Sequence, residues 1–419
     1  MKTTAVRLHG AMDIRLERFD LPPMGEGELL LRVESDALCA STYKAVRQGT
    51  AHKRVPPDVA ERPVIIGHET CGMIEGVGEK WQERYQVGEK VVIQPALKLQ
   101  SGYDPGYSYP TIGGSATYCV VPEIVPQRGC LLPFAGEGYY TGSLVESLAC
   151  VLRGFKGLYH TDYTNYVRTD GAKKGGRLAV LGGAGPMGIG AVELAVGYAG
   201  VSRVTVTDLS AERLSFAARR CTAGAAARRG VTLDYVCTAG MADPAKELLA
   251  LSEGGYDDVF VMVPVPELLS LAERICREDG CINFFAGPPV HDLPGALNLY
   301  RVHYDGIHML GTAGSIPADM EDVIRLIQEK KINPAALVSH ICGLDSVPEG
   351  ILAMAHPAGA KRVSYPHIRL PMTAIEDFAE KGKTDPLFRA LDEITRRHGG
   401  LWNAEAEAYL LQHAPRIDE

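Results

Sequence analysis

Residue types that bind metal ions lie near glycine-rich turns in the first third of the chain. The stretch Val64–Gly78, VIIGHETCGMIEGVG, carries adjacent His68 and Glu69 after an apolar run, and Cys39 lies upstream in ESDALCASTYK. A thiolate, an imidazole and a carboxylate are good zinc ligands, and three protein ligands leave one position open for a substrate. Glu146, at the start of a helical pattern, is a further carboxylate. Each residue alone has an ordinary structural explanation, so the hypothesis of a metal site rests on the group.

A second motif predicts a nucleotide site. The run RLAVLGGAGPMGIGA contains Gly183, Gly185 and Gly188 in the spacing GxGxxG, between an apolar strand and a helix. These glycines permit a tight turn, a close approach of pyrophosphate to the backbone, and close packing of helix on strand. Asp208 ends the next predicted strand, where a carboxylate binds ribose hydroxyls and repels a 2′-phosphate. This favours NAD(H), although Arg213 leaves NADP(H) open because a guanidinium binds phosphate well. The predicted cofactor-binding residues are Gly183, Gly185, Pro186, Met187, Gly188, Asp208 and Arg213.

The order of the predicted elements assigns the two sites to different domains. Residues 1 to about 150 contain short alternating runs such as LLLRVES and KVVIQPAL, punctuated by Gly and Pro, which indicates a β-rich, barrel-like region. From there to Ser315, apolar strands alternate with helical stretches, the pattern of a doubly wound parallel sheet. The tail beyond about Pro366 carries helical patterns, and Asn403 is expected to cap the last of them.

Composition narrows the classes of function. A chain of 419 residues predicts two domains. The 43 basic and 51 acidic residues give a net charge of −8, which argues against a nucleic acid or an anionic membrane as partner. No apolar run approaches the roughly 18 residues of a membrane span, and the N-terminus lacks the apolar core of a signal peptide. Ten cysteines without a CxxC pair predict reduced thiols and a cytoplasmic location.

These motifs together resemble the zinc-dependent medium-chain dehydrogenases. The resemblance rests on Gly67-His68-Glu69-x-x-Gly72-x5-Gly78, on Cys39-x-Ser41 and on the GxGxxG run, and it covers residues 1 to about 365. It implies a Rossmann doubly wound sheet inserted in a GroES-like β-barrel catalytic domain, with a helical C-terminal extension. The implied limits are 1–154 and 316–419 for the catalytic domain, including the extension at 365–419, and 155–315 for the Rossmann domain.

The family resemblance also implies the metal ligands and the route of the proton. Cys39, His68 and either Glu69 or Glu146 bind one catalytic zinc ion, which acts on the substrate oxygen as a Lewis acid. Glu146 resembles the glutamate of the polyol dehydrogenase branch, and the choice between the two carboxylates stays open. The loop PALKLQSGYDPGYSYPTIGG has none of the cysteines of the family's second, structural zinc, so one zinc per chain is expected. Ser41 passes the hydroxyl proton outward, and Lys44 stands where the family often has the next relay histidine.

The substrate is expected to be a sugar or polyol. The stretches CASTYKAVRQG and HKRVPPDVAE, with the long tail, resemble the L-sorbose 1-phosphate reductase group, which implies a ketose phosphate and a polyol phosphate. Basic residues between Lys44 and Arg54 could hold the phosphate, with Lys53 and Arg54 as the candidates. An unphosphorylated polyol or L-threonine-type dehydrogenase is the first alternative. A zinc-free reductase and a non-catalytic nucleotide-binding regulator are others. A homodimer or homotetramer is expected from the family.

Overall fold

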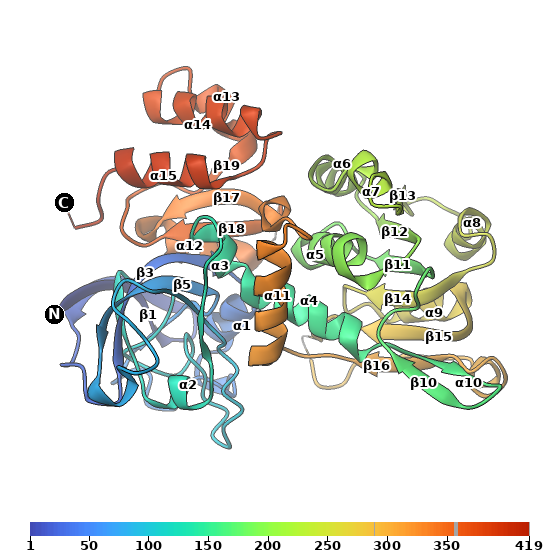
Figure 1. Cartoon of the computed structure of the whole chain (residues 1–419), viewed down its shortest axis with the longest axis horizontal. Coiled ribbons are helices and arrows are strands. Elements are labelled where there is room, and N and C mark those ends of the chain that lie inside the picture. The colour runs from blue at the N-terminus through green and yellow to red at the C-terminus, as the bar shows by residue number, and fades with distance from the viewer. Residues whose placement is uncertain (289, 356–358, 419) are drawn as a thin grey trace. The chain divides into compact units, whose positions relative to one another are not determined.

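The computed structural model of the protein describes residues 1–288, 290–355 and 359–418. The chain forms two compact units (Figure 1). The first unit comprises residues 1–146, 316–324 and 338–419, and the second comprises residues 147–315 and 325–337. Among the described residues, no helix is both long enough and apolar enough to cross a membrane.

Antiparallel strands dominate the first unit. Its large sheet has the order β19-β17-β18-β3-β5-β6-β8, with β7 also pairing with β3, and a smaller sheet has the order β2-β1-β4. Leu29, Leu31 and Val33 are buried at alternate positions of β3, as expected for a strand with one face on a core. The strands are β1 (Lys2–Gly10), β2 (Asp13–Asp20), β3 (Leu29–Leu38), β4 (Val64–Ile65), β5 (Thr70–Val77), β6 (Lys90–Ile93), β7 (Tyr118–Val121), β8 (Leu131–Pro133), β17 (Val338–Gly343), β18 (Lys361–Tyr365) and β19 (Thr373–Ala374).

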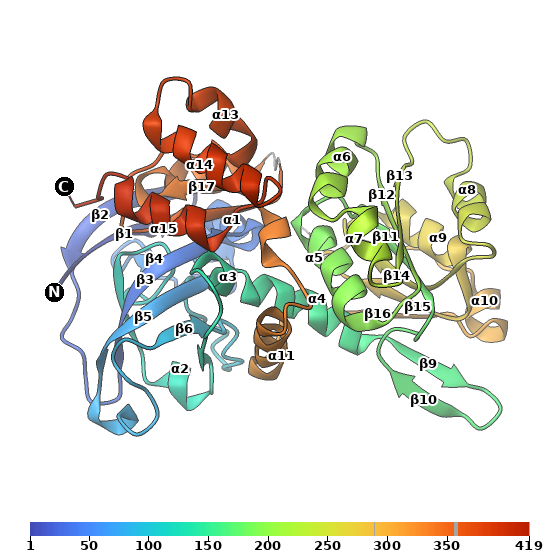
Figure 2. The same ribbon diagram turned by 45° about the horizontal axis from the view of Figure 1, so that its top comes forward.

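Short helices connect and cover these strands. They are α1 (Ala40–Gln48), α2 (Ile124–Gln127), α3 (Tyr140–Ser143), α12 (Val347–Leu352), α13 (Phe378–Lys381), α14 (Pro386–Arg397) and α15 (Ala404–His413). The predicted C-terminal helices α13, α14 and α15 gather together in both views of the chain, and they lie above β17 in the first (Figures 1 and 2). The Asn403 side chain accepts a hydrogen bond from the backbone N–H of Ala406, so its predicted capping role is confirmed. Trp402 is fully buried where this extension packs.

The second unit is built on a six-stranded parallel sheet, which confirms the predicted doubly wound sheet. The strand order is β13-β12-β11-β14-β15-β16, the order in which a dinucleotide binds at the carboxyl ends of the strands. All six residues of β14 are buried, as expected for a strand covered on both faces. The strands are β9 (Tyr159–Asp162), β10 (Val167–Asp170), β11 (Arg177–Leu181), β12 (Arg203–Asp208), β13 (Thr232–Cys237), β14 (Tyr256–Val261), β15 (Cys276–Phe284) and β16 (His308–Gly311).

The helices of this unit alternate with its strands. They are α5 (Pro186–Leu194), α6 (Ala211–Arg220), α7 (Ala223–Ala227), α8 (Pro244–Leu251), α9 (Pro266–Ile275) and α10 (Leu299–Tyr304). Strands β9 and β10 form an antiparallel hairpin apart from the main sheet (Figure 2). Two further helices, α4 (Val145–Gly157) and α11 (Pro317–Gln328), contain two of the points at which the chain passes between the units.

Candidate metal and nucleotide sites

The turn that carries His68 and Glu69 is shaped by Gly67. This glycine has φ +94°, and a Cβ there would lie 2.2 Å from a carboxylate oxygen of Asp36 and 2.7 Å from the backbone nitrogen of Ser115. Only glycine fits such a backbone without strain. Asp36 in turn accepts a hydrogen bond from the backbone N–H of Glu69 at 3.1 Å, which fixes the turn to β3.

Three predicted ligands come together in the first unit. Cys39 lies between the end of β3 and the start of α1, and its Sγ, a ring nitrogen of His68 and a carboxylate oxygen of Glu69 all lie within 4.8 Å of one another. His68 and Glu69 are 5% and 1% exposed and Cys39 is partly buried, so this is a largely buried set of thiolate, imidazole and carboxylate donors. That donor set suits zinc.

The buried Glu69 carboxylate has one partner and one open oxygen. Lys361, at the start of β18, forms an ion pair with Oε1, while Oε2 is buried without a hydrogen-bond partner among the described residues. Burial raises the pKa of Glu69 to about 7, although the Lys361 ammonium opposes this. Burial lowers the pKa of Lys361, but the charges of Glu69, Cys39 and Glu146 and the hydrogen bond to Glu69 together outweigh it, so that pKa is raised. A buried acceptor without a donor is costly, and a cation beside Oε2 would satisfy it.

The imidazole of His68 is held on both of its nitrogens. Nδ1 lies 3.0 Å from the Thr42 hydroxyl, whereas Nε2 lies 3.2 Å from Ser41 Oγ and 3.3 Å from Tyr107 Oη. Burial lowers the pKa of His68, which favours the neutral ring that a metal requires. The Tyr107 hydroxyl also donates to Ser41 Oγ at 2.9 Å, and Ser41 donates to Cys39 Sγ at 3.1 Å.

Glu146 lies in the first turn of α4, and its charge acts on His68 in the sense that raises the histidine pKa. The Glu146 charge therefore acts on the site, but the carboxylate within the tight cluster of donor atoms is that of Glu69. Lys44 lies on α1 one turn after Ser41, a spacing that puts the two side chains on one helix face.

The basic residues proposed for a phosphate surround His52. Arg54 pairs with Asp104 through Nε at 2.7 Å, and its guanidinium lies 5.0 Å from the centre of the Tyr107 ring. Lys53 is exposed. The pKa of His52 is lowered to about 4 by burial and then by Arg54, Lys53 and Lys44, so this segment is electropositive. The His52 ring stacks on Tyr107 with 6.0 Å between centroids, which joins the segment to the metal cluster.

The nucleotide motif lies between β11 and α5 in the second unit. Gly185 is the N-cap of α5, Pro186 begins the helix with Met187 after it, and Gly188 packs so closely that a Cβ would lie 2.0 Å from the Gly183 carbonyl oxygen. The α5 N-terminus therefore follows a glycine turn, the arrangement that binds pyrophosphate.

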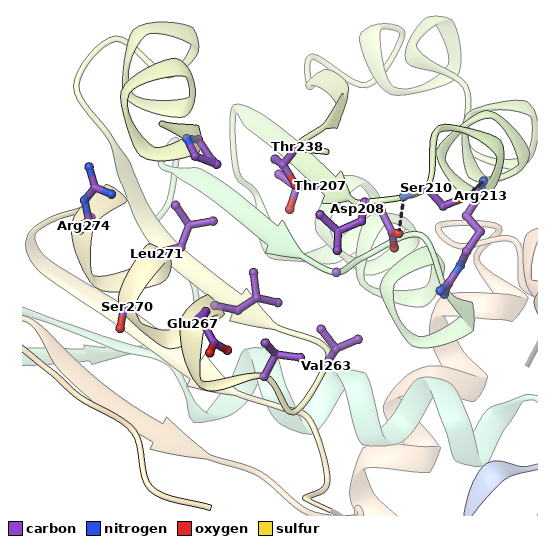
Figure 3. Close-up of a pocket in the computed structure, with 15 residues that line it drawn as sticks. Thr207, Asp208, Ser210, Arg213, Thr238, Val263, Glu267, Ser270, Leu271 and Arg274 are labelled. Carbon is purple, nitrogen blue, oxygen red and sulfur yellow. Dashed lines mark hydrogen bonds between the residues drawn. The ribbon is translucent and has the colours of Figure 1, made fainter. Parts of the chain in front are cut away.

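A cavity of about 760 Å³ adjoins this motif (Figure 3). Asp208, at the end of β12, accepts from the backbone N–H of Ser210 at 3.1 Å and of Ala184 at 3.3 Å. Arg213 lies at the same end of the cavity, with Nη2 3.0 Å from where a Cβ of Gly185 would lie. The rest of the lining is largely apolar, and it includes Thr238, Val263, Leu268, Leu271 and Arg274.

Sequence reasoning missed Lys361, Thr42, Tyr107 and Asp36. Lys361 and Tyr107 are distant in sequence from the residues they contact, so no local pattern identifies them. Asp36 carried no distinctive signal, because β3 also contains the charged residues Arg32 and Glu34.

Known protein families match both units of the chain. Residues 25–128 match the model of the alcohol dehydrogenase GroES-like domain, and residues 186–329 match the zinc-binding dehydrogenase model. A mannitol-1-phosphate 5-dehydrogenase of Aliivibrio fischeri is 42% identical over 98% of both chains. An L-sorbose 1-phosphate reductase of Klebsiella pneumoniae is 43% identical over 99% of this chain and 98% of its own. The crystal structure of 2R,3R-butanediol dehydrogenase from Bacillus subtilis has a TM-score of 0.70 at 23% identity, covering 87% of this chain and 99% of that one.

Proposed function

The chain belongs to the zinc-binding dehydrogenase family, and from this premise we propose that it interconverts a ketose phosphate and a polyol phosphate with a nicotinamide cofactor. The family matches confirm the resemblance drawn from the sequence, and they confirm the expected fold of a Rossmann sheet with a GroES-like domain. The observation that carries the proposal is the buried cluster of Cys39, His68 and Glu69, in which one Glu69 oxygen has no hydrogen-bond partner among the described residues.

We propose that Cys39, His68 and Glu69 hold one zinc ion per chain and that Glu146 acts on the same ion from α4. Charge balance supports this set. A thiolate and two carboxylates carry three negative charges, which a divalent cation and the Lys361 ammonium together neutralise. Buried charges need such compensation. The Lys361 ion pair also leaves Glu69 Oε2 as the free donor atom.

When bound, zinc supplies a Lewis acid that lowers the pKa of a substrate hydroxyl, and the nicotinamide exchanges the hydride. The protein's part is to orient these groups and to move the proton. Ser41 is the proton relay in this proposal, because its hydroxyl lies beside Cys39 Sγ and His68 Nε2. Tyr107 donates to Ser41 and thereby orients that hydroxyl. Lys44, one turn further along α1, is the proposed outer end of the relay.

For the cofactor, we propose NAD(H) as the preferred partner. Asp208 places a carboxylate beside the cavity, where it favours ribose hydroxyls over a 2′-phosphate. Its two backbone hydrogen bonds, from Ser210 and Ala184, hold the carboxylate in place at the end of β12. Arg213 lies next to Gly185, where its guanidinium favours binding of the pyrophosphate. A guanidinium also binds a 2′-phosphate, so this position allows NADP(H) to bind as well.

For the substrate phosphate, we propose Lys53 and Arg54 as the binding groups. The Asp104 partner orients Arg54 through Nε. A bidentate guanidinium contact to phosphate uses two of its five N–H donors, so the Asp104 pair leaves donors for a phosphate. The two sugar-phosphate relatives extend over nearly the whole chain, which supports a phosphorylated substrate.

A reduction screen tests the proposal. Ketose phosphates and their free sugars are offered with NADH and with NADPH, and the oxidation of the cofactor is followed. We expect turnover of a ketose phosphate at a kcat/KM well above that of its free sugar. Neutralising Lys53 and Arg54 should then raise KM for the phosphate at least tenfold, since a hydrogen bond to a charged group contributes about 1.5–3 kcal/mol. The free sugar should be unaffected by this change.

The alternatives predict other outcomes of the same screen. Equal turnover of free and phosphorylated sugars would identify an unphosphorylated polyol dehydrogenase. A loss of activity on both substrates in the Lys53 and Arg54 variant would mean that the segment is structural. No turnover of any alcohol or ketone, despite bound cofactor, would indicate a nucleotide-binding regulator and would refute the proposal.

We also propose a reducing compartment such as the cytoplasm and a homodimer or homotetramer. Support for the first comes from the ten cysteines, all of which carry free thiols. Support for the second comes from family membership. Light scattering on the purified protein measures the assembly, and a monomer at all concentrations would contradict it.

A further inference from the structure

The C-terminal extension places a buried carboxylate against the segment that leads to the metal site. Glu407 lies on α15 and is 2% exposed. Its oxygens accept hydrogen bonds from the backbone N–H groups of Tyr139, at 2.5 Å, and Tyr140, at 2.8 Å, and from the Tyr365 hydroxyl at 2.9 Å. The Tyr365 oxygen in turn accepts from Trp402 Nε1 at 2.7 Å. The carboxylate therefore accepts three hydrogen bonds directly, and Trp402 Nε1 is linked to it through the Tyr365 hydroxyl.

The segment that receives Glu407 is shaped to admit the carboxylate. Gly138 has φ +70°, and a Cβ there would lie 2.8 Å from Glu407 Oε2. Lys90 holds the segment from β6, since its ammonium donates to the carbonyl oxygens of Gly136 at 2.8 Å and Gly138 at 3.2 Å. The Lys90 ammonium is also the cation whose charge acts on Glu407.

This segment leads directly to Glu146. Tyr140 begins α3, which ends at Ser143, and α4 begins at Val145 with Glu146 in its first turn. The backbone N–H groups that Glu407 binds therefore lie at the start of α3, and only Leu144 separates α3 from α4, whose first turn carries the Glu146 carboxylate. A shift at Tyr140 would be transmitted along α3, because its four residues are all buried.

We infer that Glu407 is a positioning residue of the metal site: the carboxylate of the C-terminal extension fixes the start of the α3–α4 stretch and thereby the position of Glu146. This inference deepens the proposed function and depends on the role given there to Glu146. It also gives the extension a function, since a carboxylate on α15 orders a residue near the metal cluster without contacting the metal.

The test compares Glu407→Gln with the wild type as intact, zinc-loaded chains at pH 8, where the wild-type carboxyl is ionised. The amide keeps one acceptor oxygen, so one of the two backbone N–H groups loses its partner. We expect the zinc dissociation constant, measured by competition with a chromogenic chelator, to rise about fivefold, below the roughly 10- to 100-fold cost of losing a direct hydrogen bond to a metal ligand. The visible spectrum of the Co²⁺-substituted variant should change as well, because it reports the geometry around the metal.

Two matched variants separate positioning from a general loss of stability. Glu405→Gln makes the same change in the first turn of α15, where the side chain is exposed and pairs with Arg397 and His398, and it should leave zinc affinity and spectrum unchanged. Tyr365→Phe removes a buried hydrogen bond to Glu407 but keeps both backbone bonds. It should lower Tm while zinc affinity stays within about twofold. If Glu407→Gln does not fold, Glu407→Asp retains the charge at a shorter reach and should show a smaller rise in the same constant.

A double-mutant cycle with Glu146→Gln decides the mechanism. In the Glu146→Gln background, Glu407→Gln should have no further effect on zinc affinity. Additive effects, or an unchanged Co²⁺ spectrum in Glu407→Gln, would overturn the inference while leaving the proposed function intact. If Glu146→Gln alone leaves zinc affinity and spectrum unchanged, the proposed role of Glu146 is wrong, and the inference falls with it.

Discussion

The hydrogen bond between Thr42 and His68 allows a quantitative prediction for Thr42→Val. A metal bound to Nε2 requires the ring proton on Nδ1, and the Thr42 hydroxyl, 3.0 Å from Nδ1, is then the acceptor for that proton. Valine has nearly the same shape but accepts no hydrogen bond. Thr42 is 2% exposed and His68 is 5% exposed, so water cannot readily replace the lost oxygen.

The size of the effect on zinc affinity depends on whether the metal-free or the metal-bound protein requires the proton on Nδ1. In the metal-free protein, the neutral ring of the variant can move its proton to Nε2, next to Ser41 and Tyr107. In the metal-bound protein it cannot, so a buried N–H stays unsatisfied at a cost of about 1–3 kcal/mol. The cost therefore appears as weaker metal binding, with a zinc dissociation constant raised about 10- to 100-fold.

Chelator competition measures this constant, and Thr42→Ser is the matched control because it restores the hydroxyl. The serine variant should bind zinc within about threefold of the wild type. Binding of NAD(H), followed by nicotinamide fluorescence, should be unchanged in both variants because its cavity is lined by the second unit. Zinc affinity in Thr42→Val equal to that of Thr42→Ser would show that Thr42 does not accept the ring proton, and so would contradict a metal bound through Nε2.

Three further predictions test other parts of the account. Cys39→Ser should lose zinc by metal analysis and lose activity, yet bind NAD(H) as before; retained zinc would remove Cys39 from the ligand set. Asp208→Ala should narrow the preference for NAD(H) over NADP(H) in steady-state kinetics, and better efficiency of the wild type with NADP(H) would contradict the assignment. Burial raises the pKa of Glu407 from 4.5 to about 7, so the unfolded chain loses this proton first and stability should fall as pH rises across that interval. In urea unfolding of metal-depleted protein, Glu407→Gln should lack this component, about 3 kcal/mol.

The parts of the fold that local sequence encodes were predictable. The alternation of apolar strands with helices predicted the parallel sheet, and Gly183 to Gly188 predicted the turn from β11 into α5. Asn403 marked the start of α15 because an N-cap needs only a side chain and a backbone N–H three residues on. The His68-Glu69 pair indicated where the three candidate ligands meet, because the glycines around it predicted a tight turn.

Contacts between distant segments could not be predicted in this way. Lys361 meets Glu69 because β18 pairs with β3, a pairing that no motif in either strand specifies. Glu407 is an acidic residue in the first turn of α15, a position that favours negative charge in any helix, so the local sequence does not indicate a buried role for it. The structure instead shows its carboxylate buried against Tyr139 and Tyr140. These contacts depend on how distant strands and helices pack together, which the whole sequence determines and no short stretch of neighbouring residues does.

The most direct test of the central claim is a zinc titration of metal-depleted protein, with reduction of a ketose phosphate by NADH as the readout. We expect no reduction without zinc, a linear rise in activity as zinc is added, and a break at one zinc ion per chain, with no break in a Cys39→Ser variant. Full activity of the metal-depleted protein, or a break at two zinc ions per chain, would contradict a single catalytic zinc at Cys39, His68 and Glu69.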